Sequence, residues 1–196
     1  MNIPEKPVER QQMPQRPVLQ GTKVILRPIT MEDTERIVRW RNDPQVQKKF
    51  IYRQPFTAEG HIQWMQTKVA TGAVVQYMIV EQQTGRPVGS VYYRDIDAIH
   101  NSAEFGIFIG ELDARGVGLG TETARLFVRF GFETLGLHRI YLRVLAENIP
   151  ARKSYEKGGF RTEGFAREMV YLDGEYHDVV FMAVLNSDPR GEITKE

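Results

Sequence analysis

The 196-residue chain contains no cysteine. This absence excludes disulfides, thiolate metal ligands and a cysteine nucleophile. Long apolar runs are missing as well, because no stretch approaches the ~20 residues that a membrane-spanning helix needs. The N-terminal "MNIPEKPVERQQ" also lacks the apolar core of a signal peptide. We therefore expect a cytoplasmic protein with no membrane partner.

The chain also has no excess of charge of one sign. It holds 26 Lys and Arg residues against 25 Asp and Glu residues, a formal net charge of +1. This balance argues against a broad nucleic-acid-binding face, so we expect no nucleic acid partner. Its histidines show no pair at metal-ligand spacing, so we expect no metal site and interpret them as surface or satisfied residues: they are His61, His100, His138 and His177.

The remaining composition is that of a globular domain. Apolar residues make up 41% of the chain and charged residues 26%, and the length suits one domain with a real core. Four prolines among polar residues predict a flexible tail over 1–20. We expect the folded domain over 21–186 and a second tail over 187–196.

Hydrophobic periodicity predicts a mixed α/β (α+β) domain on one twisted mixed sheet of about seven strands. In chain order we expect a strand, two helices, three strands, a helix, a strand, a short helix and a terminal two-strand hairpin. The predicted strands are 23–29, 74–82, 87–96, 103–110, 139–145, 164–172 and 176–185, and the first two helices begin after Thr30 and Thr57.

The segment "DARGVGLGTETARLF", residues 113–127, places Arg115, Gly116, Gly118 and Gly120 between a predicted strand and a predicted helix. Helix N-termini expose unpaired amides and a partial positive charge, so they attract phosphate groups. A Walker A loop needs a lysine after the glycines, and none is present. A dinucleotide fingerprint needs a G-x-G-x-x-G spacing, which this segment lacks. The sequence therefore favours a diphosphate-binding loop that is neither a Walker A loop nor a dinucleotide fingerprint.

The pattern Arg-x-x-Gly-x-Gly resembles the Q/R-x-x-G-x-G/A pyrophosphate loop of the GNAT superfamily of acetyl-CoA-dependent N-acetyltransferases. The chain continues with "AEN" at 146–148, "SYEKGGF" at 154–160 and "EG" at 163–164, which are similar to further family segments. The resemblance spans roughly residues 22 to 185. Partly through residues 27–46, it looks closest to the branch of ribosomal-protein, spermidine and amino-sugar acetyltransferases.

This resemblance implies a cofactor site for acetyl-CoA, used as a co-substrate. The strands over 103–110 and 139–145 would splay apart and hold the pantetheine arm, with the first strand offering its backbone edge. The implied cofactor-binding residues are Phe108, Ile109, Gly110, Arg115, Gly116, Val117, Gly118, Leu119, Gly120, Thr121, Asn148, Ser154 and Tyr155. A backbone amide of the same strand would also stabilise the oxyanion that forms on the thioester.

Two catalytic residues are predicted. Tyr155 matches the helical tyrosine of the family and is the candidate acid for the departing thiolate. Glu104 lies on the cofactor strand and is the candidate base for the amine, acting directly or through water. With no cysteine and no G-x-S-x-G elbow, direct attack is favoured over an acyl-enzyme.

The acceptor amine stays open at this stage. The resemblance suggests a protein N-terminal amine, a nucleotide-linked amino sugar or a polyamine, chosen by residues 42–64 and the terminal hairpin. A polyamine would want several carboxylates, and "FTAEG" supplies only one. Two alternatives involve no acetyl transfer: the protein could be an inactive acyl-CoA sensor or scaffold, or it could bind ATP or NAD. Self-association as a homodimer is a further option.

Overall fold

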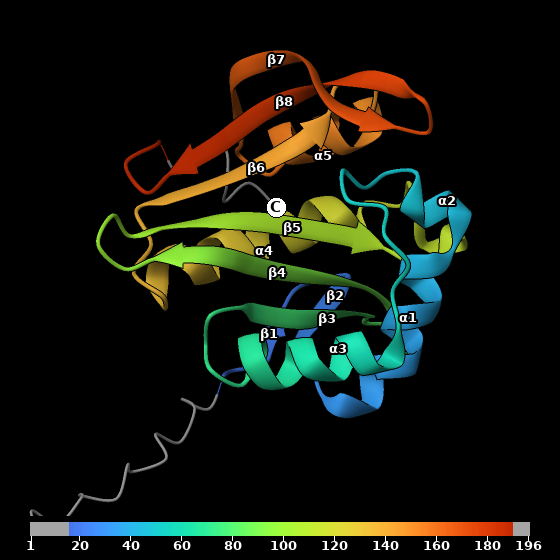
Figure 1. Cartoon of the computed structure of the whole chain (residues 1–196). Coiled ribbons are helices and arrows are strands. Elements are labelled where there is room, and N and C mark those ends of the chain that lie inside the picture. The colour runs from blue at the N-terminus through green and yellow to red at the C-terminus, as the bar shows by residue number, and fades with distance from the viewer. Residues whose placement is uncertain (1–15, 190–196) are drawn as a thin grey trace, which may run out of the picture.

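The computed structural model describes residues 16–189, in which eight strands form one sheet (Figure 1). The order across the sheet is β1-β2-β3-β4-β5-β6-β8-β7, and β5 and β6 are the only parallel neighbours among these strands. The strands are β1 (Leu19–Gln20), β2 (Val24–Pro28), β3 (Val75–Glu81), β4 (Pro87–Asp97), β5 (Ser102–Ile109), β6 (Arg139–Leu145), β7 (Arg161–Leu172) and β8 (Glu175–Leu185).

Helices cover both faces of the sheet (Figure 1). They are α1 (Thr34–Asn42), α2 (Pro44–Gln47), α3 (Ala58–Trp64), α4 (Leu119–Glu133) and α5 (Ile149–Lys157), with 3-10 turns at Met31–Asp33 and Leu112–Ala114 and a π-helical end to α3 at Met65–Val69. The α4 and α5 helices pack on one face and α1 and α3 on the other. No helix within residues 16–189 is long and apolar enough to span a bilayer.

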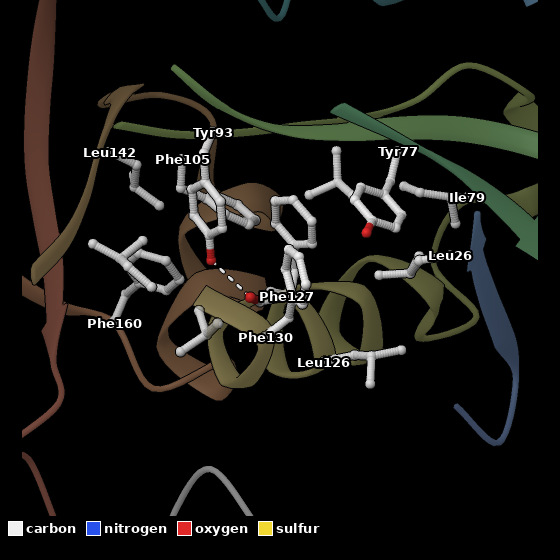
Figure 2. Packing of buried hydrophobic residues seen from close by; sticks show 14 of the residues in the cluster. Leu26, Tyr77, Ile79, Tyr93, Phe105, Leu126, Phe127, Phe130, Leu142 and Phe160 are labelled. Carbon is white, nitrogen blue, oxygen red and sulfur yellow. Dashed lines mark hydrogen bonds between the residues drawn. The ribbon is translucent and has the colours of Figure 1, made fainter. Parts of the chain in front are cut away.

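The larger core lies between the sheet and α4 (Figure 2). Its centre is aromatic: the rings of Tyr93 and Phe127 stack with centroids 4.4 Å apart, and Tyr77 meets Phe127 edge-on at 5.5 Å. The buried Tyr93 hydroxyl donates to the Phe127 carbonyl at 2.7 Å. The hydrogen bond therefore satisfies a polar atom that would otherwise be costly to bury.

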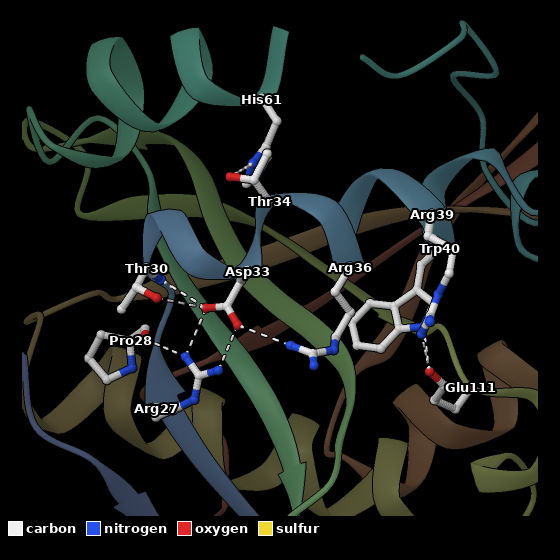
Figure 3. A network of polar contacts seen from close by, with 10 residues as sticks. All are labelled: Arg27, Pro28, Thr30, Asp33, Thr34, Arg36, Arg39, Trp40, His61 and Glu111. Carbon is white, nitrogen blue, oxygen red and sulfur yellow. Dashed lines mark hydrogen bonds and ion pairs between the residues drawn. The ribbon is translucent and has the colours of Figure 1, made fainter. Parts of the chain in front are cut away.

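The α1 helix is anchored at both ends on the opposite face (Figure 3). At its start, the buried Asp33 carboxylate accepts from the Arg27 guanidinium at 2.8 and 2.6 Å and from the Thr30 amide at 2.9 Å. At its end, the Trp40 indole N–H donates to Glu111 at 2.9 Å. A Cβ on Gly110 would overlap the Trp40 ring, so glycine allows this close approach. These contacts hold α1 over the end of β5.

The seven predicted strands are all present, and the structure adds one strand and one short helix. Leu19 and Gln20, which the sequence placed in a tail, pair with the outer edge of β2 as β1. The Tyr77 hydroxyl also donates to the Pro17 carbonyl at 3.0 Å. This end of the tail is ordered because it satisfies an edge that would otherwise be unpaired. Residues 1–15 and 190–196 of the predicted tails lie outside the described residues.

The β5 and β6 strands splay apart as expected. They pair only over Ser102–Glu104 with Arg139–Tyr141, whereas β5 continues to Ile109 and β6 continues along β8 to Leu145. Residues 105–109 of β5 therefore face a gap in the sheet. The mixed α/β fold with a splayed strand pair is confirmed.

Candidate active site

A cavity of about 820 Å³ occupies the gap between β5 and β6. One part is lined by the glycine loop before α4 and by α5, and the other part by α1, α3 and the segment that joins them. The cavity therefore connects the two faces of the sheet. A ligand that enters beside α4 can meet a second ligand that enters beside α1.

The glycine loop gives α4 an open N-terminus. Gly118 is the N-cap with φ of 95°, and Gly116 has φ of 79°, a left-handed region that favours glycine. The first amide to bond back into the helix is that of Glu122, which donates to the Gly118 carbonyl at 3.1 Å. The amides of residues 119–121 therefore have no helical partner and fit a diphosphate.

The other residues of the loop differ in what they can offer. The Val117 carbonyl accepts from the Lys23 ammonium at 3.2 Å, which places a cation that sequence reasoning missed beside the loop. Leu119 has a buried side chain, so only its backbone can reach a ligand. Thr121 and Ser154 are joined by a 3.0 Å hydroxyl contact, and Gly120 faces Ser154, so these residues hold α4 against α5.

Arg115 and Gly110 lie at the end of the β5 edge. The Arg115 guanidinium donates to the Ile109 carbonyl at 3.1 and 2.9 Å, and burial lowers its pKa. Arg115 thus closes the loop against the strand. The Gly110 amide donates to Val88 of the β4 side at 2.8 Å, so it does not face the gap.

This alternation corrects the predicted backbone edge. Peptide groups of a strand point to opposite sides at successive residues, so the amide of Phe108 points to β4 with that of Gly110. The Ile109 carbonyl and the amides of Ile107 and Ile109 face the gap instead. Of the three predicted edge residues, only Ile109 turns its backbone groups to the gap, and Ile107, which was not among them, does so too.

Tyr155 lines the cavity from α5. Its ring meets Phe105 and Phe160 edge-on at 6.1 and 6.0 Å, which fixes its orientation. Burial, with a smaller effect from Tyr92, raises the pKa of the Tyr155 phenol, so its O–H donor is retained at neutral pH. Tyr92 was not foreseen. Its ring lies where a Cβ on Gly106 would be, and the glycine inside a strand was the available signal.

Asn148 is the N-cap of α5 and also lines the cavity. Its carbonyl accepts from the Arg152 amide at 3.1 Å. Its side-chain amide makes no hydrogen bond with residues 16–189 and is therefore available to a ligand.

Glu104 is not placed as a general base. Its side chain is buried, with the whole residue 5% exposed, and its two carboxylate oxygens accept from Arg94 at 3.1 and 3.2 Å and from Arg143 at 3.0 and 3.1 Å. Burial opposes the charge, but the hydrogen bonds from Arg143 and Arg94 outweigh it and lower the pKa of Glu104. A carboxylate bound on both oxygens is a poor proton acceptor, so this geometry favours a counter-ion over the predicted base.

His61 differs from the surface or satisfied histidine that we expected. The residue is 1% exposed, and its Nδ1 lies 3.0 Å from the Thr34 hydroxyl (Figure 3). Its Nε2 has no hydrogen-bond partner within residues 16–189, and the side chain lines the cavity. Burial lowers the pKa of His61, so the ring is neutral at pH 7. No group in the described part of the chain has the composition of a metal site.

Comparisons with known proteins agree with this geometry. Residues 23–161 match the acetyltransferase (GNAT) domain family. The spermidine N(1)-acetyltransferase of Escherichia coli K12 is 30% identical over 161 residues, which cover 82% of this chain and 85% of that protein. The spermidine N(1)-acetyltransferase of Vibrio cholerae is 28% identical over 167 residues, covering 85% of this chain and 95% of that protein.

A solved structure shows the same fold. The crystal structure of the V. cholerae spermidine N-acetyltransferase in complex with CoA and spermine superposes with a TM-score of 0.79 at 27% identity, over 85% of this chain and 98% of that chain. Another structure of the V. cholerae enzyme is dodecameric. The chain therefore belongs to the GNAT family and is an acetyl-CoA-dependent N-acetyltransferase.

Proposed function

We propose that this N-acetyltransferase moves the acetyl group directly from acetyl-CoA to a primary amine, and that the two substrates meet in the gap between β5 and β6. One observation carries the proposal: the first turn of α4, with its unpaired amides, and the open edge of β5 line a single cavity. Acetyl-CoA supplies a thioester carbonyl that is open to attack by an amine.

The cofactor half is assigned to residues that the cavity brings together. The amides of 116–121 bind the diphosphate, with Lys23 adding positive charge and Asn148 adding a side-chain amide. The gap-facing amides of Ile107 and Ile109 bind the arm and polarise the thioester carbonyl. Backbone donors of this kind contribute about 3 to 4 kcal/mol in comparable oxyanion sites.

The proton steps are assigned to Tyr155 and His61. The Tyr155 O–H donates a hydrogen bond to the departing thiolate, and because burial raises its pKa, hydrogen bonding contributes more than full proton transfer. The unpartnered Nε2 of His61 accepts the proton of the amine, directly or through water. Glu104 holds Arg94 and Arg143 in place and does not move a proton.

Release of free CoA tests the proposal. We expect purified protein to bind CoA and to release thiol from acetyl-CoA only when an amine is present. Mass spectrometry of the protein during turnover distinguishes direct transfer from an acetyl-enzyme. Tight CoA binding without release over a broad amine panel would favour the sensor, and heat protection by ATP or NAD but not by CoA would favour the nucleotide binder.

A cytoplasmic location remains a prediction from the sequence.

We also propose that two copies associate through the β7–β8 hairpin. The hairpin carries the edge strand of the sheet, with Phe165, Tyr171 and Tyr176 exposed. Light scattering on wild-type protein and on a Phe165→Ser variant tests this. A monomer at all concentrations would contradict it.

A further inference from the structure

The acceptor half of the cavity is rich in arginine. Arg41 of α1, Arg94 of β4 and Arg143 of β6 line it, and Glu104 is the one acidic residue of the described chain that does so. Glu104 bonds the Nε and Nη2 atoms of both Arg94 and Arg143. A single carboxylate therefore serves two guanidinium groups, and the third is left over.

The left-over cation is Arg41. No carboxylate of residues 16–189 forms an ion pair with it, and its guanidinium lies 3.9 Å from the centre of the Phe50 ring and 5.2 Å from that of Phe56. Burial lowers the pKa of Arg41, the nearby Tyr92 phenol partly offsets this, and the positive charge of Arg94 adds to the lowering. A partly buried guanidinium that has aromatic neighbours and no carboxylate partner can bind the anionic group of a ligand.

Arg94 and Arg143 lie close to the place where acetyl transfer is proposed to occur. Arg94 is paired in register with Glu104, and Arg143 lies two residues after Tyr141, the last residue of β6 that pairs with β5. The Tyr52 ring covers both side chains, with centroid distances of 5.5 Å to Arg94 and 5.9 Å to Arg143. The cluster therefore flanks the start of the gap where the thioester is proposed to lie.

We propose that the acceptor amine carries a carboxylate or phosphate group, which Arg41 binds with support from Arg94 and Arg143. This inference rests on the proposed function and names its substrate class. A planar guanidinium suits both anions because it offers parallel N–H donors. A polyamine such as the spermine bound by the V. cholerae enzyme would instead place ammonium groups beside the Arg41 guanidinium, which has no carboxylate partner.

An acceptor panel tests the proposal with the full-length protein. Free CoA release is followed with spermidine, with an amino acid whose carboxylate is free, and with a nucleoside-diphosphate amino sugar. We expect one of the two anionic amines to exceed spermidine in kcat/KM by about tenfold or more. A preference for the amino acid would identify the anionic group as a carboxylate, and a preference for the nucleotide sugar would identify it as a phosphate. A preference for spermidine would overturn the proposal and leave N-acetyl transfer intact.

Substitution of Arg41 supplies the second test. Arg41→Gln should raise KM for the anionic acceptor about tenfold to a hundredfold and leave KM for acetyl-CoA unchanged, while Arg41→Lys should fall between. The matched control is Arg129→Gln, an exposed arginine of α4 on the other face. An unchanged acceptor KM in folded Arg41→Gln would refute the proposal.

A binding measurement separates this inference from the proposed function. Calorimetry of the anionic amine with CoA-loaded protein needs no turnover. Binding that is lost in Arg41→Gln and weakened by salt would support the anion site even if no acetyl transfer occurred. Binding that is unaffected by Arg41→Gln and by salt would contradict the anion site.

Discussion

Replacing Glu104 by glutamine separates the two roles that this carboxylate could have. The substitution keeps the shape of the side chain, removes its charge and turns an N–H donor toward guanidinium donors. The wild-type carboxylate is 5% exposed and accepts four charged hydrogen bonds of 3.0 to 3.2 Å. Breaking a buried ion pair on one side costs about 3 to 5 kcal/mol. At about 2 to 4 °C per kcal/mol for a domain of this size, Tm should fall by roughly 6 to 20 °C.

Thermal melting followed by circular dichroism measures this loss. The matched control is Glu163→Gln, because Glu163 pairs with Arg139 where both side chains are more than a third exposed. Exposed pairs contribute about 1 kcal/mol or less, so this variant should melt close to wild type. A loss confined to Glu104→Gln would reflect burial and not the mere removal of a carboxylate.

The contribution of Glu104 to the stability of the fold should depend on pH in a definite direction. Because the folded-state pKa of Glu104 is lowered, its stabilisation is present above the unfolded pKa of about 4.3 and is lost as pH falls through the folded value. The difference in Tm between wild type and Glu104→Gln should therefore shrink in acid. The acidic limb of the pH-rate profile should survive in the variant. An unchanged Tm together with a vanished limb would refute this reasoning and restore Glu104 as the base.

Three further substitutions test the site. Tyr155→Phe should bind CoA normally and lose turnover about a hundredfold or more, since removing one positioned hydrogen-bond donor to a developing anion typically costs that much; unchanged turnover would remove the phenol from the chemistry. Gly118→Ala, at φ of 95°, should weaken CoA binding, whereas Gly136→Ala, at φ of 69° and away from the loop, should cost stability alone; equal CoA dissociation constants would contradict the cradle. His61→Gln should remove an acidic limb that lies below pH 6.5, because burial lowers the pKa of this histidine; a persisting limb would place the base elsewhere.

Much of the fold follows from local sequence patterns. The pattern at 139–145 predicts a strand with the bounds that the structure has, and the glycine pattern predicts an open helix N-terminus where α4 begins, because both signals lie in consecutive residues. The splayed strands came from a family resemblance attached to those same residues. Periodicity and glycine chemistry act over short distances, so they can be read without knowing what packs against them.

The roles of single site residues depended on the tertiary structure. Glu104 is a suitable base on an isolated strand, and it becomes a counter-ion because the neighbouring strands bring Arg94 and Arg143 to its two oxygens. The surplus charge of Arg41 likewise exists only where α1 faces the sheet. Burial and partner choice determine proton affinity and ligand charge, and both are set by strand pairing and helix packing between residues far apart in the chain.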